Sequence, residues 1–208
     1  MAKKLSTGCL VTAGVLIVLA LILFSFFKGT YNRLVDVDES VNNAWAQVEN
    51  QLQRRMDLIP NLVETVKGYA NFERETLEAV INARASATQT TLNADQLAQD
   101  PAMMEQFMQA QNNLGSALSR LMVVVERYPE LKANENFRTL MDQLEGTENR
   151  IAVERKRYND TVQTYSKTIR AFPTVVIAGL LGFGQRPYFE APEEANQAPK
   201  VDFGASEK

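Results

Sequence analysis

Residues 5–27 read LSTGCLVTAGVLIVLALILFSFF, an uncharged stretch bracketed by lysines at positions 3, 4 and 28. An α-helix rises about 1.5 Å per residue, so roughly 18 of these residues cover the hydrocarbon core of a bilayer. A buried core helix and a cleaved signal peptide are the alternatives. The stretch is longer than a usual apolar signal core, however, and no small-x-small cleavage site follows it. We therefore predict an uncleaved transmembrane anchor over residues 10–28, in contact with the lipid bilayer, after a short N-terminal tail of residues 1–9.

The segment after the anchor has helical periodicity over a long distance. Apolar residues recur every three or four positions, which is typical of one face of an amphipathic helix. Pro60 lies inside this stripe without changing its register. Proline removes a backbone hydrogen bond and clashes with the preceding turn, so we expect a kink, or a boundary between two collinear helices. The stripe consists of Leu34, Val37, Val41, Trp45, Val48, Leu52, Met56, Ile59, Val63, Val66 and Ala70.

Three further amphipathic helices are expected. Asn71 can cap a second helix over residues 72–88, which a polar loop over residues 86–100 follows. Asp100-Pro101 is typical of a helix start, and the third helix should run over residues 101–128, where Pro129 ends it. A fourth helix should span residues 134–170.

These helices define the expected fold. No segment alternates with period two over a useful length, so no sheet is expected. Four long amphipathic helices with short connections bury their stripes most simply as an up-and-down bundle. The sequence therefore predicts an all-α protein, with a single N-terminal transmembrane helix followed by an up-and-down four-helix bundle over residues 29–171.

Composition limits the chemistry. The whole chain has no histidine and one cysteine, Cys9, which removes the commonest general base, the Ser/His and Cys/His nucleophile systems and every site with a histidine ligand. Past the anchor, acidic residues outnumber basic ones, which argues against nucleic acid as a partner. Glu145 and Glu148 with Asn149 could hold a hard cation, but such carboxylates are commonplace on solvated helix faces. We expect no enzyme, no catalytic residue, no cofactor and no metal.

Polar residues interrupt the apolar stripes in two places. On the fourth helix these are Thr147–Glu148 and Glu154–Arg155, and on the first helix Arg54–Arg55 lies beside the stripe. One interpretation is that they are edge positions whose long side chains reach water. The other is a polar layer inside the bundle, with Arg55 facing Glu148, which would fix helix register more than add stability.

The last apolar stretch, residues 172–183, reads FPTVVIAGLLGF and is too short to span a bilayer as a helix. It either caps the bundle or forms an adhesive surface for a partner, a neighbouring copy or the membrane interface. Residues 184–208 are rich in Pro, Glu and Ala and are predicted to be a disordered tail, in which Tyr188–Phe189 is the one docked point.

Several motifs together resemble the LemA family over roughly residues 10–190. The resemblance implies a bacterial membrane protein with a four-helix bundle domain, for which no enzymatic activity is established. A related branch takes part in forming magnetosome membranes, which suggests a membrane-organising role by analogy. It also supports a structural or assembly role for Arg55, Pro60, Asn61 and Glu148. The matching motifs are Tyr31-Asn32, Ala44-Trp45, Arg54-Arg55-x-Asp57-Leu58-Ile59-Pro60-Asn61-Leu62-Val63, Leu144-Glu145-Gly146-Thr147-Glu148-Asn149-Arg150-Ile151, Arg157-Tyr158-Asn159, Phe172-Pro173, Gly182-Phe183 and Tyr188-Phe189-Glu190.

Two functions remain open. The first is a membrane-anchored, non-enzymatic scaffold or assembly factor at the bacterial envelope, which associates with copies of itself and with other membrane proteins. The second is a sensor or adaptor that binds a small ligand, peptide or cation in the bundle. Basic residues flank the anchor equally, two on each side, so the positive-inside rule does not orient it. The free amino terminus favours an inner-membrane protein with its bundle on the extracytoplasmic side. The residues we expect to carry structure or interaction are Arg55, Pro60, Asn61, Glu148, Arg150, Tyr158, Phe172, Pro173 and Phe183.

Overall fold

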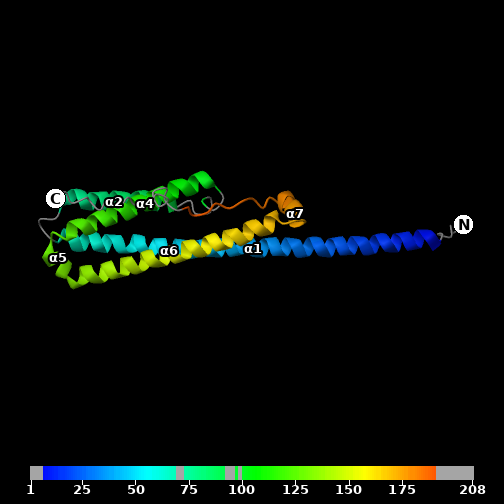
Figure 1. Ribbon diagram of the computed structural model, residues 1–208, viewed down its shortest axis with the longest axis horizontal. Coiled ribbons are helices and arrows are strands. Elements are labelled where there is room, and N and C mark those ends of the chain that lie inside the picture. Colours follow the sequence, from blue (N-terminus) through cyan, green and yellow to red (C-terminus); the bar gives the residue numbers. More distant parts are fainter. Residues whose placement is uncertain (1–6, 69–72, 92–96, 98–99, 191–208) are drawn as a thin grey trace, which may run out of the picture.

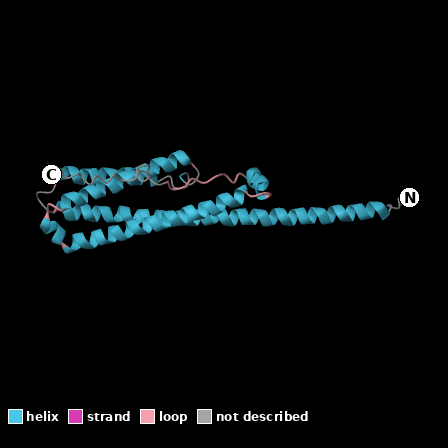
Figure 2. Cartoon of the chain, viewed as in Figure 1, coloured by secondary structure: helices cyan, strands magenta, loops and turns pink. Residues whose placement is uncertain are grey.

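The computed structural model describes residues 7–68, 73–91, 97 and 100–190, and in this part of the chain every regular element is a helix (Figures 1 and 2). The all-α class, with one long apolar N-terminal helix leading into a helical bundle, is confirmed. The helices are α1 (Thr7–Lys67), α2 (Arg74–Thr91), α4 (Pro101–Val125), α5 (Pro129–Ala133), α6 (Glu135–Arg170) and α7 (Thr174–Leu181).

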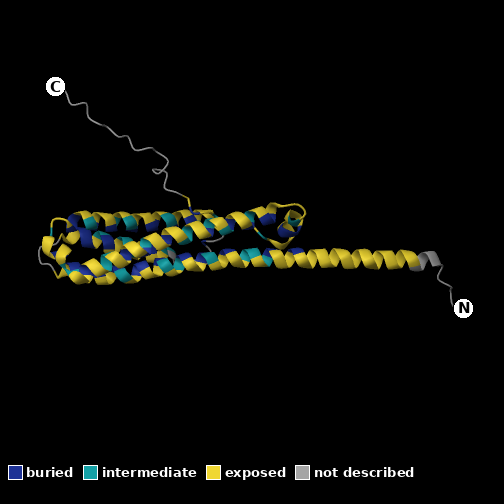
Figure 3. Ribbon diagram, turned by 60° about the horizontal axis from the view of Figure 1, so that its bottom comes forward, coloured by how far each residue is buried: buried dark blue, intermediate teal, exposed yellow. Residues whose placement is uncertain are grey.

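Helix α1 joins the apolar stretch to the bundle without interruption. Every residue from Val11 to Gly29 is exposed, Thr30 is the first buried residue, and Leu34 begins the buried stripe. Figure 3 shows the exposed part projecting from the bundle as a straight extension. This part is long and apolar enough to cross a membrane, and none of it is buried by the protein. The apolar stretch and the first bundle helix are therefore one element.

Pro60 lies within α1, so it is not a boundary between two helices. A proline at position 60 cannot donate a hydrogen bond to the carbonyl of Met56, four residues before it. Arg84 of α2 donates from its Nε to that carbonyl at 2.9 Å. The acceptor that the proline leaves free thus becomes a point of attachment for α2.

The long helices pack most closely in two pairs, α1 with α6 and α2 with α4. In the first pair Trp45 lies against Tyr158, and Arg55 lies opposite Glu148. Ten residues forward in α1 therefore correspond to ten residues back in α6. The two helices run antiparallel in constant register, as the apolar stripes require.

Two predicted helix ends are wrong by a few residues. Helix α2 continues to Thr91 instead of ending near 88, and Ala87, close to this end, is buried in the core. Helix α4 ends at Val125 instead of 128, because a residue that precedes a proline, here Tyr128, disfavours the helical conformation.

Other helix ends follow the capping signals. Asp100 accepts a hydrogen bond from the Ala102 N–H at 2.9 Å, and Asn134 accepts one from the Phe137 N–H at 3.0 Å. Both are N-cap residues. The sequence predicted the cap at Asp100, whereas at Asn134 it predicted only the start of the helix. Pro129 ends the region of α4, but it also begins α5, which the sequence did not predict. The proposed Asn71 cap lies outside the described residues.

The chain reverses direction after α6. The Phe172–Pro173 peptide bond is cis, and α7 begins directly after it. Gly182 ends α7 with a φ of 78°, a left-handed conformation that favours glycine, and the Phe183 N–H donates to the Ala178 carbonyl. Residues 184–190, here called the return segment, then run back along the bundle (Figure 1).

Candidate functional site

A polar layer separates two hydrophobic cores in the middle of the bundle. The core nearer the exposed part of α1, here called the membrane-proximal core, includes Leu34 to Leu52 of α1. The core farther from it, here called the distal core, begins on α1 at Met56, and Arg55 lies between the two. On α6 Thr147 and Glu148 occupy the corresponding place. The buried glutamine Gln111 does so on α4. Three helices therefore contribute polar residues at one level.

Arg55 is the centre of this layer, with only 4% of its surface exposed. Its Nη1 donates to Glu148 Oε1 at 2.8 Å, and its Nη2 donates to Gln111 Oε1. The Arg55–Glu148 contact that the interrupted stripes predicted is present. Glu148 is 42% exposed, so water reaches one end of the pair. The other interpretation, in which both side chains lie at exposed edges, does not hold for Arg55.

A groove lies between α4 and α6 at the level of the polar layer, and residues of α1 form its floor. Its volume is about 880 Å³, within the range of ligand pockets. Its polar lining comes chiefly from Arg55, Gln111, Asn112, Ser116, Glu148 and Arg155. Its apolar lining includes Leu52, Phe107, Ile151 and Phe189.

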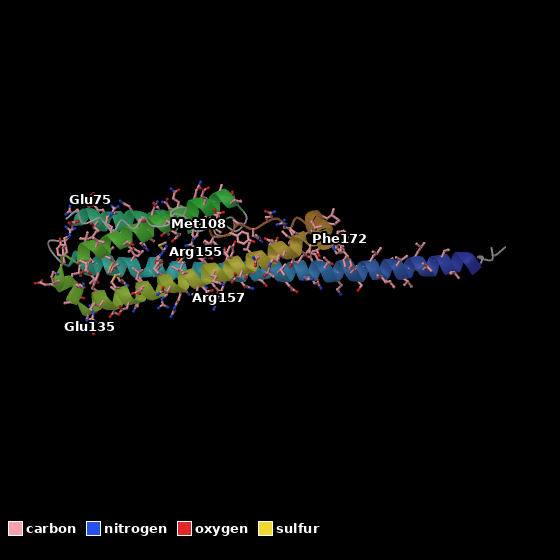
Figure 4. All side chains as sticks on the ribbon, in the orientation of Figure 1. Glu75, Met108, Glu135, Arg155, Arg157 and Phe172 are labelled. Carbon is pink, nitrogen blue, oxygen red and sulfur yellow. The ribbon has the colours of Figure 1, made fainter. Side chains whose placement is uncertain are left out.

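The groove has an excess of positive charge and of hydrogen-bond donors. Arg55 Nε and Gln111 Nε2 are buried and have no hydrogen-bond partner in the structure. Arg155 makes no ion pair with any described residue, and its Cζ lies 4.6 Å from the centre of the Phe189 ring. Figure 4 shows Arg155 in the central part of the bundle. Burial, followed by repulsion from Arg55, lowers the pKa of Arg155, while Glu148 opposes this shift. An anionic or hydrogen-bond-accepting group would complement this lining.

Helix α6 holds the return segment through three polar side chains. The Tyr158 hydroxyl donates to the Pro187 carbonyl at 3.0 Å, and the Tyr165 hydroxyl donates to the Gly184 carbonyl at 2.9 Å. Asn159 bonds Phe189 twice: its Nδ2 donates to the Phe189 carbonyl, and its Oδ1 accepts from the Phe189 N–H, both at 2.9 Å. These bonds bring together two of the motifs, Tyr158-Asn159 and Tyr188-Phe189, which are thirty residues apart in the chain.

The aromatic end of the membrane-proximal core forms around Phe189. Its ring stacks on Trp45 with centroids 5.7 Å apart and meets Tyr158 edge-on at 5.2 Å. Burial raises the pKa of Tyr158 to about 12, although the charge of Arg186 opposes the shift. Burial, followed by the charge of Asp38, also raises the pKa of Tyr165.

An ion pair ties the return segment to α1. Arg186 Nη2 donates to Asp38 Oδ1 at 2.7 Å, and both side chains are largely shielded from water. Burial by itself would lower the pKa of Arg186, but the hydrogen bond and charge of Asp38 outweigh it, so the pKa is raised. The prediction of a disordered tail is therefore wrong for residues 184–190, and docking extends beyond Tyr188–Phe189. Residues 191–208 lie outside the described part of the chain.

The apolar segment 172–183 is partly buried in the bundle and partly exposed on its surface. Ile177 and Ala178 are buried in the membrane-proximal core, and Phe183 packs against it. Phe172 is 86% exposed and Leu180 is 78% exposed. Figure 4 shows Phe172 at the end of the bundle from which the exposed part of α1 extends. The segment thus caps the bundle and also presents an apolar surface.

The remaining predicted residues lie on the surface. Asn61 is exposed, and its backbone carbonyl accepts a hydrogen bond from Thr65. Arg150, Glu145 and Asn149 are also exposed. No cluster of three or more His, Cys, Asp or Glu side chains that could hold a metal occurs among the described residues.

Several residues of the site were missed from the sequence. Gln111 could have been found, because it lies between Phe107 and Leu114 on the apolar stripe of α4, where a polar residue is unexpected. The partners of Asn159 and Arg186 could not have been found from the sequence, because they lie 30 and 148 residues away in the chain. The pairing of Arg84 with Met56 could have been suspected only from the proline at position 60.

These features define a class of protein: a helical bundle that continues directly into one helix long and apolar enough to cross a membrane, with a polar groove but no recognisable catalytic group in the described residues. The chain belongs to the LemA family, whose model matches residues 44–203.

Curated relatives agree with this assignment. The chain is 27% identical to magnetosome protein MamQ 2 of Paramagnetospirillum magneticum over 204 residues, which covers 90% of this chain and 75% of that protein. It is 28% identical to magnetosome protein MamQ of Magnetospirillum gryphiswaldense, over 76% of this chain and 64% of that protein. It is 24% identical to protein LemA of Metamycoplasma hominis, over 89% of this chain and 78% of that protein.

Proposed function

We propose that this protein is a non-enzymatic, membrane-anchored scaffold whose copies associate side by side at the bacterial envelope. The observation that carries the proposal is the uninterrupted α1, which leads from the anchor into the bundle with no break at Lys28 or Gly29. A helix transmits orientation, whereas a flexible linker does not. Neighbouring copies in one membrane would therefore meet with their bundles at the same height.

The relatives named as magnetosome proteins support a role in membrane organisation by analogy. The groove supports binding, not catalysis, because no described side chain in it is a nucleophile with an adjacent base. Partners of the scaffold would be further copies of the chain and other membrane proteins.

The test is the mass of the full chain in mild detergent and in native nanodiscs, compared with a variant that carries a Gly-Ser linker inserted between Lys28 and Gly29. We expect defined oligomers for the unchanged chain, and their loss in the linker variant while the bundle melts at the same temperature. A monomer at every concentration, or oligomers that tolerate the linker, would contradict the scaffold.

For location, we propose the cytoplasmic membrane with the bundle on the extracytoplasmic side. The test uses Val123→Cys, at an exposed position of α4, in a Cys9→Ser background. An impermeant thiol reagent should label this variant in intact cells. Labelling only after lysis would place the bundle on the cytoplasmic side of the membrane.

A second function is favoured by a separate observation, the unpaired donors of Arg55 and Gln111 in the groove. We propose, as the alternative, a sensor or adaptor that binds the carboxylate end of a peptide beside Arg155. Short peptides with a free carboxyl terminus should raise the melting temperature of the full chain, and amidated versions should not. Arg155→Gln should remove the shift, while Arg150→Gln, an exposed change on the same helix, should retain it. Equal shifts with both peptide forms would exclude this function.

A further inference from the structure

An uncharged stretch covers one end of the bundle. Residues 171–185 contain no charged side chain, and Arg170 and Arg186 flank them. Five large apolar side chains in this stretch are exposed, namely Phe172, Val175, Val176, Leu180 and Leu181. Such a concentration on one short helix is unusual for a surface in contact with water.

The outward side chains share a face of α7. Val176 and Leu180 are four residues apart in α7, so they lie one above the other on the helix, and the exposed Phe172 lies just before its first turn. Ile177 and Ala178 point the other way and are buried in the membrane-proximal core. Because its inner face is packed, α7 is held with its apolar outer face away from the bundle.

The register of α1 and α6 places α7 at the level where the exposed part of α1 meets the bundle. Trp45 lies opposite Tyr158, and twelve further residues along each helix bring position 33 of α1 opposite Arg170, the last residue of α6. Thr30 is the first buried residue of α1, and α7 contacts both α1 and α6 (Figure 1). Helix α7 therefore begins at the level of α1 where the bundle starts.

The distance from this level to the apolar span is short. Phe27, the last residue of the uncharged stretch, is three residues before Thr30, which at a rise of about 1.5 Å per residue is roughly 5 Å. The headgroup layer on each side of a bilayer is about 5–8 Å thick, and interfacial helices lie within about 5–10 Å of the acyl boundary. If Phe27 marks the edge of the hydrocarbon core, α7 lies within the headgroup layer.

We propose that α7 is a membrane-interface helix whose outer face, with Phe172, Val176 and Leu180, inserts into the same bilayer that α1 spans. The exposed basic residues Lys28, Arg33 and Arg170 lie close to this level and suit contact with lipid phosphates. A second copy of the chain fits less well as the occupant. A stable interface between proteins needs about 800 Å² per partner, more than one eight-residue helix supplies.

The consequence is a second point of attachment. A single transmembrane helix fixes the height of the bundle but leaves it free to rotate about the helix axis and to tilt. Insertion of α7 beside α1 fixes both, so one side of the bundle always faces the membrane surface. This inference goes beyond the scaffold proposal, since α7 can insert in a monomer as well as in an oligomer.

The experiment uses the full chain with Cys9→Ser and one introduced cysteine, reconstituted in nanodiscs and labelled with an environment-sensitive fluorophore. Val176→Cys is the test position, Val153→Cys on α6 is an exposed control within the bundle, and Val15→Cys marks the membrane core. Lipids with a quencher near the headgroup or deep in the acyl chain report depth. We expect the label at 176 to be blue-shifted and quenched mainly by the shallow lipid, the label at 15 mainly by the deep lipid, and the label at 153 by neither.

Two results would overturn the proposal. The first is a label at 176 as water-exposed and unquenched as the one at 153. The second is a blue shift at 176 that persists in lipid-free amphipol and weakens as the total protein concentration is lowered, which would indicate a second copy as the occupant. A further variant, Val176→Asp with Leu180→Asp, leaves the buried Ile177 unchanged. It should keep the bundle's circular dichroism and melting while neighbouring labels lose their quenching.

Discussion

The two cores on either side of the polar layer are built differently. The distal core is mainly aliphatic and is enclosed by α1, α2, α4, α5 and α6. The membrane-proximal core is centred on aromatic residues, and the parts that close it come from the end of the described chain, α7 and Phe189. The distal core therefore uses only helices, whereas the proximal core depends on a return segment held by side-chain hydrogen bonds.

This difference separates two kinds of stability. A helix that packs along its whole length cannot leave the core without global unfolding, but a short extended segment can detach by itself. We expect the distal half to unfold with the whole bundle and the return segment of the proximal half to open locally. Local opening at the end nearest the membrane would expose apolar surface beside the bilayer, where a partner or lipid can cover it.

The largest expected effects compare one phenylalanine from each half. Phe137→Ala, on α6 in the distal core, should lower the free energy of unfolding by about 3–5 kcal/mol, since it leaves a cavity among fixed helices. Phe189→Ala should lower it less, because the return segment can detach instead. Denaturant unfolding of the detergent-solubilised chain, followed by circular dichroism, measures both.

Hydrogen exchange then distinguishes local from global loss. In Phe189→Ala, the backbone amide of residue 189 should lose its protection while α2 amides keep theirs. Equal losses of unfolding free energy in the two variants, with protection of residues 184–190 retained, would contradict a separable proximal half.

Sequence patterns predicted the helices of both halves and the polar residues between them. They did not predict how the membrane-proximal core is closed. Apolar spacing of three and four residues is a local property, so it located α1, α4 and α6, and the same spacing revealed Arg55 and Glu148 as interruptions. The closure of the proximal core is not local. Residues 184–190 are rich in polar and turn-forming types, and their order comes from Tyr158, Asn159 and Asp38, which the chain presents far away.

The polar layer itself provides the next test. Glu148→Ala should lower the free energy of unfolding by about 2 kcal/mol, because Arg55 keeps Gln111 but loses its carboxylate in a buried place. This loss of stability is smaller than the loss expected for a fully buried pair, because water reaches Glu148. Arg55→Met combined with Glu148→Leu should be close to neutral. Glu145→Ala, an exposed change on the same helix, is the matched control. A double variant as unstable as Glu148→Ala would show that the pair adds net stability.

Alkaline pH should weaken the proximal half in particular. Tyr158 has a pKa of about 12 in the folded chain, against about 10 for an unfolded tyrosine. Between these values the unfolded state binds fewer protons, so the free energy of unfolding falls as pH rises from about 10 to 12, by up to about 2 kcal/mol. Unfolding midpoints measured at both ends of this window test it. In Tyr158→Phe the fall should become smaller, and an unchanged slope would mean that Tyr158 does not contribute.

The smallest effect concerns the ion pair between the return segment and α1. Arg186→Gln should lower the free energy of unfolding by about 1 kcal/mol, because both side chains keep some contact with water and Asp38 can regain hydration when Arg186 is gone. A double-mutant cycle with Asp38→Asn isolates the interaction from other contacts of Arg186. High salt should weaken the pair less than it weakens the exposed Lys156–Asp160 pair, which serves as a reference. If the return segment opens independently, Arg186→Gln must increase hydrogen exchange at residues 184–190 without changing exchange in α2. An equal increase in both places would mean that the two halves of the bundle unfold as one unit.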